Sequence, residues 1–368
     1  MQNIDQFLKV KLYSMQLAYR NFSLRRHHAF VFKVPTYVYN FLSVLVAFSI
    51  ISCSRKNVPS KFNQKSVKVL SPINQADPSI FHYNGTYYLY GTNDNKADSG
   101  FLVYTSKDLK NWTLYGSALR KGDAYGDWGF WVPQVWADNG KFYMAYTANE
   151  RISIAESESP KGPFRQTVKQ PLSSEFRQID PYVFIDDDGK KYLYHVRLNE
   201  GNHIYVAEIN NDYSSLKPGT YKECISATPT TWEHVNNASV TIAEGPTVVK
   251  KRGLYYLFYS VNDFRNKNYA VGYAISQYVN GPWTRYAGNP ILHTTITGQS
   301  GSGHGDLVKG KGHKLYYVFH THNSATVVGP RKSAIVDIKY VKDANGDYCF
   351  VVDKDSFRYL QFNSVNKP

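Results

Sequence analysis

A short phrase that recurs five times constrains the fold of this chain more than any other feature. In each copy an anchor residue opens a β-type run, a turn glycine follows eight or nine residues later, and an aromatic-rich run begins within the next four residues. The turn glycines are Gly85, Gly140, Gly189, Gly253 and Gly312, and the matching anchors are Asp77, Val132, Asp180, Glu244 and His304. A packing residue is expected where an inner strand begins, yet three anchors are carboxylic acids and a fourth is histidine. The anchors therefore indicate an active site.

The repeat also predicts the architecture. Successive anchors lie 48 to 64 residues apart, the runs between them alternate apolar and polar residues, and no helical period is present. Repetition of β-type runs at this length is typical of a propeller whose blades are small antiparallel sheets. We therefore expect an all-β fold, a five-bladed β-propeller. The innermost strand of each blade starts near the central axis at one face, so the polar anchors should meet in one place.

Proline positions leave the register of the fourth anchor open. Asp77, Val132 and Asp180 are each followed directly by proline, which holds the preceding residue extended and is tolerated at a strand start. The fourth copy reads Glu244-Gly245-Pro246. Counted from the turn glycine, Glu244 fills the anchor slot; aligned on proline, it lies one residue early. In the second alignment its side chain enters the site from a different angle.

The first 53 residues differ from the rest and predict an export signal, a signal peptide over residues 1–53. Basic residues precede an apolar run, 41–51, whose 11 residues are too few to span a bilayer but suit a signal-peptide core. The run leads to Ser52-Cys53, and its end resembles a bacterial lipobox, in which the cysteine becomes the lipidated first residue. We expect an exported protein, a periplasmic or cell-surface lipoprotein of a bacterial outer membrane anchored through Cys53. A plainly cleaved signal is the alternative, and Met15 is an alternative start.

The remaining sequence is expected to form a tether and one domain. Residues 54–67 are polar and aperiodic, as in a tether, and residues 68–368 have the length of a single propeller, which would be the catalytic domain. Cys224 and Cys349 lie in different repeats, and in an exported protein they could pair or stay free. The net charge of +14 is dispersed, which favours a solvated surface over attraction to an acidic polysaccharide. Nucleic acid is not an expected partner of an exported chain.

Three carboxyl groups around one pocket suit a reaction that needs an acid and a base together. Cleavage of a glycosidic bond is such a reaction, because one carboxylic acid protonates the departing oxygen while one carboxylate activates water on the opposite face of the sugar. In the inverting form the two groups lie ~6.5 to 9.5 Å apart, a gap that non-adjacent blades can supply across a central depression. A third carboxylate near the acid would raise the pKa of the acid by like-charge repulsion.

The sequence resembles glycoside hydrolase family 43, whose members are five-bladed propellers that act on arabinose- and xylose-containing plant polysaccharides. The resemblance runs from Asp77 to about Arg331 and rests on five phrases whose order and spacing are specific. These are Ala76-Asp77-Pro78-Ser79-Ile80, Phe130-Trp131-Val132-Pro133-Gln134-Val135, Ile179-Asp180-Pro181-Tyr182-Val183-Phe184, Ala243-Glu244-Gly245-Pro246 and Gly303-His304-Gly305. The chain departs from the family pattern at Gln134, where many members carry an acidic residue.

The resemblance implies a role for four anchors. It implies Asp77 as general base, Glu244 as general acid, and Asp180 as the residue that tunes the pKa of the acid and orients it. It places His304 at the propeller axis, near a calcium or other cation, although no cofactor is required. Structural alternatives exist for each: Asp77 and Asp180 could accept backbone hydrogen bonds at strand starts, and Glu244 could be a buried ion-pair partner. His304 could be a core histidine, since calcium prefers six to eight oxygens.

Further residues are candidates for the pocket wall. Trp131 directly precedes an anchor and could stack on a sugar ring or wedge between blades. Arg331 resembles an arginine that in family members reaches the bound sugar or a catalytic carboxylate; a surface ion pair is its alternative. The loop 125–130 is expected to form the rim of further subsites. Asp94 and Asp263 end second strands and are predicted to lie in solvated turns.

Three functional hypotheses follow. The first is an inverting, exo-acting glycosidase of plant cell-wall polysaccharide, an α-L-arabinofuranosidase or another arabinan-degrading enzyme, with β-xylosidase and endo-arabinanase as neighbouring activities. The second is a non-catalytic carbohydrate-binding propeller on the cell surface, which would have no need of three carboxyl groups. The third is a related propeller that acts on fructans or by phosphorolysis, and a fructan-type enzyme would be retaining, with a nucleophile at Asp77. A screen against arabinofuranoside, xyloside and arabinan substrates distinguishes them.

Overall fold

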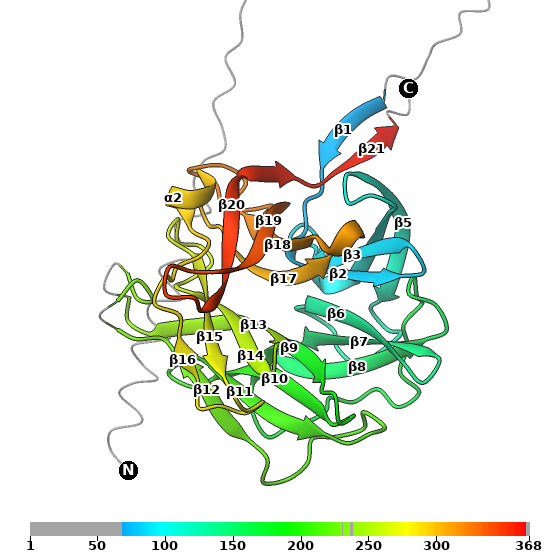
Figure 1. Ribbon diagram of the computed structural model, residues 1–368. Helices are drawn as coiled ribbons and strands as arrows, with labels where there is room; N and C mark the ends of the chain where they lie inside the picture. The colour runs from blue at the N-terminus through cyan, green and yellow to red at the C-terminus, as the bar shows by residue number, and fades with distance from the viewer. Residues whose placement is uncertain (1–67, 230, 236–237, 366–368) are drawn as a thin grey trace, which may run out of the picture. The chain divides into compact units, whose positions relative to one another are not determined.

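The computed structural model describes residues 68–229, 231–235 and 238–365 (Figure 1). Helical structure in these ranges is limited to the short segments η1 (Ala97–Ser99), α2 (Thr294–Thr297) and η2 (Lys311–His313), and the remaining regular structure is β-strand. This confirms the prediction of an all-β fold. No helix of the described ranges is long and apolar enough to cross a membrane. The predicted signal peptide with Cys53, and the tether at 54–67, lie outside the described residues.

The strands between Ala76 and Tyr359 form five consecutive antiparallel meanders, which we call units 1 to 5. Unit 1 contains β2 (Ala76–Tyr83), β3 (Thr86–Thr92), β4 (Gly100–Ser106) and β5 (Asn111–Arg120), and unit 2 contains β6 (Trp131–Asp138), β7 (Lys141–Ala148) and β8 (Arg151–Ser157). Unit 3 contains β9 (Gln178–Ile185), β10 (Lys191–Leu198), β11 (Gly201–Ile209) and β12 (Lys222–Ser226). Unit 4 contains β13 (Thr241–Lys251), β14 (Leu254–Val261), β15 (Ala270–Ser276) and β16 (Thr284–Arg285), and unit 5 contains β17 (Gly303–Lys309), β18 (Leu315–Thr321), β19 (Lys332–Lys342) and β20 (Tyr348–Tyr359). Units 3 and 4 share one sheet, but only two residue pairs, between β11 and β13, join them.

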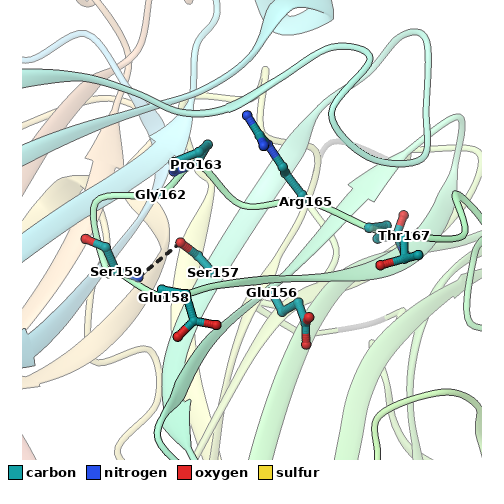
Figure 2. Close-up of a pocket in the computed structure, with 9 residues that line it drawn as sticks. Glu156, Ser157, Glu158, Ser159, Gly162, Pro163, Arg165 and Thr167 are labelled. Atoms are coloured by element: carbon teal, nitrogen blue, oxygen red, sulfur yellow. Dashed lines mark hydrogen bonds between the residues drawn. The ribbon is translucent and has the colours of Figure 1, made fainter.

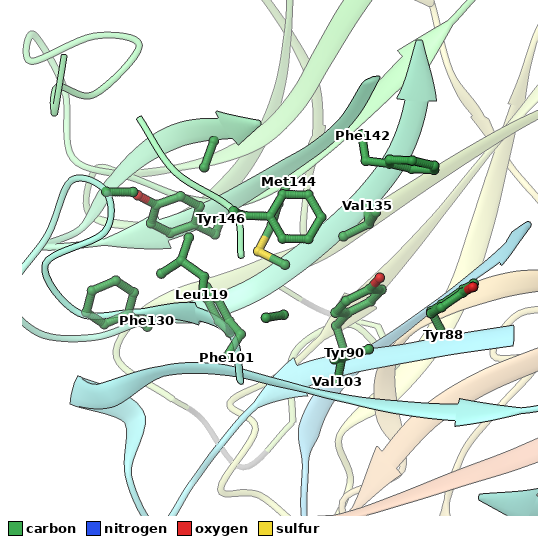
Figure 3. Packing of buried hydrophobic residues seen from close by; sticks show 14 of the residues in the cluster. Tyr88, Tyr90, Phe101, Val103, Leu119, Phe130, Val135, Phe142, Met144 and Tyr146 are labelled. Carbon is green, nitrogen blue, oxygen red and sulfur yellow. The ribbon is translucent and has the colours of Figure 1, made fainter. Parts of the chain in front are cut away.

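The first strands of the units form a closed inner ring. β2 contacts β6, β6 contacts β9, β9 contacts β13, β13 contacts β17, and β17 contacts β2. Hydrophobic clusters fill the space between neighbouring units, as Figure 3 shows for units 1 and 2, where the rings of Phe101 and Tyr146 lie 5.7 Å apart. Leu89 of unit 1 and Val318 of unit 5 belong to the cluster that closes the ring. Burial of each such side chain contributes roughly 1.5–3 kcal/mol, so the units are held together mainly by packing.

The turn glycines of the repeat lie where the sequence places them. Each follows the first strand of its unit, and their φ angles range from 64° to 81°, a region that glycine adopts without a clash of a Cβ atom. In unit 1, Tyr83 pairs with Thr86, so Asn84-Gly85 is a two-residue hairpin loop with positive φ at both positions. Asn-Gly is the sequence most favoured in this turn, because its backbone twist matches that of the strands.

The anchors start the first strands with a local bulge. Asp77, Val132, Asp180 and His304 have φ angles between 45° and 56°, and the pairing with the second strand shifts register at each of them. At the corresponding bulge of unit 4, the residue with positive φ is Gly245, at 58°. The proline alignment therefore describes the structure, and Glu244 lies one residue before the anchor slot. Non-glycine residues with such angles are uncommon and concentrate at functional sites.

Each bulge removes the N–H of the anchor from the regular ladder, and a neighbouring unit satisfies it. The N–H of Val132 donates to Thr92 Oγ1 (3.0 Å), that of Asp180 to Thr147 Oγ1 (3.1 Å), that of His304 to Ser260 Oγ (2.8 Å), and that of Asp77 to His320 Nδ1 (3.1 Å). These four acceptors occupy equivalent positions near the ends of second strands. In unit 3 this position is the apolar Val196, and the N–H of Gly245 donates instead to Asp180 Oδ2 at 3.0 Å.

The two ends of the described chain pair with each other. β1 (Lys68–Pro72) and β21 (Gln361–Val365) form an antiparallel ribbon that leaves the body of the fold in Figure 1, with Lys68 opposite Val365. β21 also joins unit 1 through two parallel pairs with β5.

The two cysteines of the described ranges, Cys224 and Cys349, do not pair with each other and are free thiols.

Candidate active site

The anchors open into one pocket of about 760 Å³, which we call the anchor pocket. All five units contribute to its lining. Every sequence-predicted site residue lines it, namely Asp77, Trp131, Asp180, Glu244, His304 and Arg331. The structure thus brings together residues that are up to 254 positions apart in the sequence.

A second hollow, of about 410 Å³, lies on unit 2 (Figure 2). Its lining includes Glu156, Glu158 and Arg165, and the dashed bond in Figure 2 runs from the N–H of Ser159 to Ser157 Oγ at 3.1 Å. None of the five anchors, all of which are described, lines this hollow. A convergent set of buried titratable groups occurs in the anchor pocket, which is therefore the candidate active site.

Asp77 is a buried carboxylate surrounded by polar groups. Its Oδ1 lies 3.1 Å from Arg331 Nη1, 3.1 Å from His320 Nδ1 and 3.4 Å from His304 Nδ1, and its Oδ2 accepts a hydrogen bond from Thr92 Oγ1 at 2.7 Å. Burial alone would raise the pKa of Asp77, but the charge of Arg331, together with His304 and His320, holds this pKa well below its ordinary value. Asp77 is therefore ionised over the whole range in which enzymes usually work, as a general base must be.

Arg331 is fixed by a carboxylate that was predicted to lie in a solvated turn. Its Nε and Nη2 donate to Asp94 Oδ2 and Oδ1 at 3.0 and 2.8 Å, and the ring of Phe264 lies 4.5 Å from its guanidinium carbon. This forked geometry holds the guanidinium in one orientation and directs Nη1 to Asp77. The surface ion pair considered for Arg331 is therefore wrong, because the side chain is buried. The prediction for Asp94 is also wrong, since Asp94 lines the pocket.

His304 lies close to the carboxyl groups of both Asp77 and Asp180. His304 Nδ1 is 3.9 Å from Asp180 Oδ2, which also accepts the N–H of Gly245. Burial, with the charges of Glu244 and Asp77, raises the pKa of Asp180 well above its ordinary value. Burial also lowers the pKa of His304, so its imidazole is neutral. The ring packs closely on Gly245, where a Cβ would come within 2.9 Å of it, so glycine is required there.

Glu244 reaches the pocket from its shifted position and meets two hydrogen-bond donors. Tyr269 Oη donates to its Oε1 at 2.8 Å, and Asn202 Nδ2 donates to its Oε2 at 2.7 Å. Burial raises the pKa of Glu244, the two donors lower it, and the charges of Asp77 and Asp263 raise it again, which leaves the pKa at about 7. Such a carboxyl group is protonated for a large fraction of the time near neutral pH, as a general acid must be.

Gln134, where the chain departs from the family pattern, has a structural role. Its Oε1 accepts the N–H of Val183 at 2.6 Å, and its Nε2 donates to the Val183 carbonyl at 3.1 Å. The amide thus links units 2 and 3 by two reciprocal bonds. A carboxylate could accept the first bond but has no proton for the second.

Several residues of the site were missed by the sequence analysis. They are Thr92, Asp94, Asn202, Phe264, Tyr269 and His320. Thr92 and His320 belong to the set of second-strand residues that lie seven or eight positions after the turn glycines, so the repeat contained a signal for them. Asn202 and Tyr269 belong to no such register, because they approach Glu244 from strands and turns outside the inner ring.

The arrangement separates the protonation states of two carboxyl groups in one pocket. Asp77 is held as a carboxylate, and Glu244 can carry a proton near neutral pH. Environments that push two such pKa values apart define an acid and a base. Within the described ranges, no group of three or more His, Cys, Asp and Glu side chains is arranged to hold a metal ion.

Comparison with known proteins gives one consistent family. The model of glycosyl hydrolases family 43 matches residues 68–345. The chain is 25% identical over 305 residues to a beta-D-galactofuranosidase of Aspergillus niger, covering 77% of this chain and 84% of that protein. It is 27% identical over 237 residues to an extracellular endo-alpha-(1->5)-L-arabinanase of Bacillus subtilis, covering 59% of this chain and 69% of that protein.

Solved structures agree with this family. The crystal structure of an endo-1,4-beta-xylanase from Bacteroides thetaiotaomicron is 42% identical to the chain, with a TM-score of 0.75, and the match covers 81% of this chain and 100% of that one. The chain spans about half the length of some other curated relatives that it matches.

Proposed function

The chain belongs to family 43 of the glycosyl hydrolases, and on this premise we propose that it is an inverting glycosidase that cleaves arabinose- or xylose-containing plant polysaccharides. The single observation that carries the proposal is the pair of carboxyl groups in the anchor pocket with opposed pKa shifts, Asp77 below and Glu244 above the ordinary values. Burial of three carboxyl groups costs stability, and a non-catalytic carbohydrate-binding protein would gain nothing from two carboxyl groups with different pKa values.

The reaction takes place in one displacement. The Asp77 carboxylate removes a proton from a water molecule as the oxygen of that water attacks the anomeric carbon, and Glu244 gives its proton to the departing glycosidic oxygen. Asp77 ends protonated and Glu244 ionised, and exchange with solvent restores both. Asp180 holds the N–H of Gly245, the residue next to the acid, and so orients Glu244. Arg331 keeps Asp77 ionised.

The sugar at the site of cleavage lies between Asp77 and Glu244, and Trp131 stacks on it from the wall of unit 2. Trp131 lines the anchor pocket, and Trp128, which belongs to the loop 125–130 that we propose as the rim, packs against it at 5.9 Å and is 44% exposed. Aromatic rings at these two depths suit one sugar inside the pocket and a second at its mouth. Arg331 has little freedom to bind sugar, because its Nε and Nη2 bond Asp94.

The preferred substrate is an α-L-arabinofuranoside or arabinan, with a β-xyloside as the alternative. The relatives named above act, by their names, on galactofuranosides, arabinan and xylan, so a test of substrate has to include more than one sugar. The decisive experiment is a screen of purified protein against nitrophenyl α-L-arabinofuranoside, nitrophenyl β-D-xyloside, and linear and branched arabinan. Absence of hydrolysis of every glycoside would refute the proposed activity.

Stereochemistry tests the mechanism separately from the substrate. Inversion predicts that the first product seen by proton NMR, before mutarotation, has the opposite anomeric configuration to the substrate. Retention, or a trapped glycosyl ester on Asp77, would make Asp77 a nucleophile, as in the fructan-type alternative, and would place the carboxyl groups ~5 to 5.5 Å apart.

The fold and the axis carry two further proposals. We interpret the five units as the five blades of a propeller, which the ring of first strands supports. A calcium ion near His304 stays a prediction of the resemblance. The side chains around His304 supply few oxygens for a calcium shell, in which six to eight are usual, so water would have to complete it. The fluorescence of terbium titrated into the protein, compared with a His304→Ala variant, would test such a site.

Export and lipid anchoring are proposals from the sequence alone. If Cys53 carries the lipid, the native protein partitions into detergent and Cys53→Ala releases it in soluble form. A mature N-terminus at another position without lipid would contradict the anchor.

A further inference from the structure

Units 3 and 4 meet along one unusual contact. β11 and β13 run parallel and pair only through Gly201 with Thr241 and Asn202 with Ile242. Gly201 has a φ of 144°, and a Cβ at this position would lie 2.5 Å from the Thr241 carbonyl oxygen. Any larger residue would therefore push the two strands apart. The glycine permits an approach that the other unit boundaries lack, since the remaining described sheets are not joined in this way.

The approach of the two strands delivers an amide to Glu244. Asn202 is the first residue after Gly201, and its Nδ2 lies 2.7 Å from Glu244 Oε2. Among the described residues that line the anchor pocket, Asn202 alone comes from the third strand of its unit. Gly201 thus allows the two strands to approach, and the adjacent Asn202 donates a hydrogen bond to Glu244.

We propose that Asn202 is a positioning residue for the general acid, brought to Glu244 by the close approach at Gly201, and that it confines the proton of the acid to Oε1. This inference rests on the proposed function, in which Glu244 is the acid. The amide nitrogen can only donate, so Oε2 must remain an acceptor throughout the reaction. The Tyr269 hydroxyl on Oε1 can either donate or accept. Only that hydroxyl has to turn when Glu244 loses and regains its proton.

Other titratable and charged groups also face Glu244. These are Asp77, Asp180 and Asp263, which disfavour the ionised acid, Arg265 and Tyr269, which favour it, and the neutral ring of His304 beside Gly245. Asn202 carries no charge and acts by donating to the carboxylate. Its removal should therefore raise the pKa of Glu244 above the present value of about 7.

The test compares pH–rate profiles of kcat/KM for wild type, Asn202→Ala and Gly201→Ala on a glycoside that the wild type cleaves. Because a hydrogen bond to a charged group is the main loss, the basic limb should move up by about one pH unit in Asn202→Ala. Gly201→Ala should produce a shift in the same direction, since it moves the amide away. The matched control is Tyr205→Phe, which removes an exposed hydroxyl on the same strand that bonds Glu223, and it should leave the limb in place. Equal loss of rate at every pH in Asn202→Ala, with no shift, would overturn the proposal.

A second measurement does not depend on activity. Titration of protein labelled with ¹³C at the glutamate carboxyl groups, with Glu244→Gln to identify the resonance, reports the pKa of Glu244 directly. The resonance should titrate at higher pH in Asn202→Ala than in wild type, while circular dichroism shows the fold retained. If wild type cleaves no glycoside, the proposed function fails, and this titration still shows whether Asn202 holds down the pKa of Glu244. If wild type is active and the two titrations coincide, only the role of Asn202 is refuted.

Discussion

Replacement of Thr92 by valine should weaken the fold and the base together, because one hydroxyl serves both. Thr92 is buried, its Oγ1 donates to Asp77 Oδ2 at 2.7 Å, and the same oxygen accepts the N–H of Val132 at 3.0 Å. Valine has nearly the same shape, so the change removes two hydrogen bonds with little change of packing. The bond to the carboxylate is worth about 1.5–3 kcal/mol, and leaving the Val132 N–H without a partner costs about 1–3 kcal/mol. The two ranges add to about 2.5–6 kcal/mol, and we expect a loss near the lower end, about 3 kcal/mol, in the free energy of unfolding.

The matched control is Thr147→Val in the next unit. Thr147 is also buried and accepts the N–H of Asp180 at 3.1 Å, in the equivalent position, with no carboxylate bond among its described contacts. Its loss should be about 1–2 kcal/mol, measured for both variants by urea unfolding at pH 7 with the midpoint multiplied by the m-value. A total stability of about 5–15 kcal/mol leaves both variants folded. Equal losses in the two variants, or less than about 1 kcal/mol for Thr92→Val, would refute the reasoning.

Four other predictions concern catalysis and pH. Asp77→Asn and Glu244→Gln should each lower turnover by ~10² to 10⁴, because each removes a partner in proton transfer. Glu244→Gln should lose less activity on an activated aryl glycoside than on arabinan. Equal losses on both substrates would point to another acid. In wild type, kcat/KM should fall as pH rises through about 7, where Glu244 loses its proton, and a profile still rising at pH 8 would contradict this assignment. The pKa of Asp77 is depressed, so the stability that its ionisation contributes should be fully present above the ordinary aspartate pKa and lost as pH falls below that pKa. Urea unfolding of wild type and of Asp77→Asn at a series of acidic pH values measures this loss of stability. Lysine cannot form the two-pronged contact with Asp94, so in Arg331→Lys the pKa of Asp77 should rise. The acid limb of the pH–rate profile should then move to higher pH. An unchanged limb would show that a single positive charge is enough to keep the pKa of Asp77 low.

The inner ring was predictable from the sequence because its features repeat. Asp77, Asp180 and His304 stand in one slot relative to the turn glycines, and recurrence in equivalent positions of a symmetric fold brings them together. The fourth copy shows the limit of counting. Glu244 occupies the slot by distance from its glycine, but the bulge follows the proline, and Gly245 takes the left-handed backbone conformation instead.

The supporting contacts were harder to predict, because they join positions with no fixed spacing. Asp94 follows the end of a strand, where an aspartate is ordinarily expected to be solvated. Its buried partner, Arg331, lies 237 positions later in the sequence. Asn202 likewise depends on the meeting of β11 and β13, which is a property of the tertiary packing. Thr92 is different, because hydroxyl or imidazole groups recur near the ends of second strands, but their purpose emerges only once the anchors are known to be bulged.

The ribbon formed by β1 and β21 determines how the molecule would respond to a mechanical pull. Because Lys68 lies opposite Val365, a force applied to the two chain ends acts at one edge of the ribbon and opens its hydrogen bonds one after another, as in a zipper. Bonds loaded in sequence part at lower force than bonds that share the load. Phe362 of β21 packs on the cluster that contains Leu89 and Val318, but β2 and β17 also meet through contacts of their own, which involve neither strand of the ribbon. Under tension the ribbon of β1 and β21 would open first, and the ring of first strands that carries the carboxyl groups would stay closed.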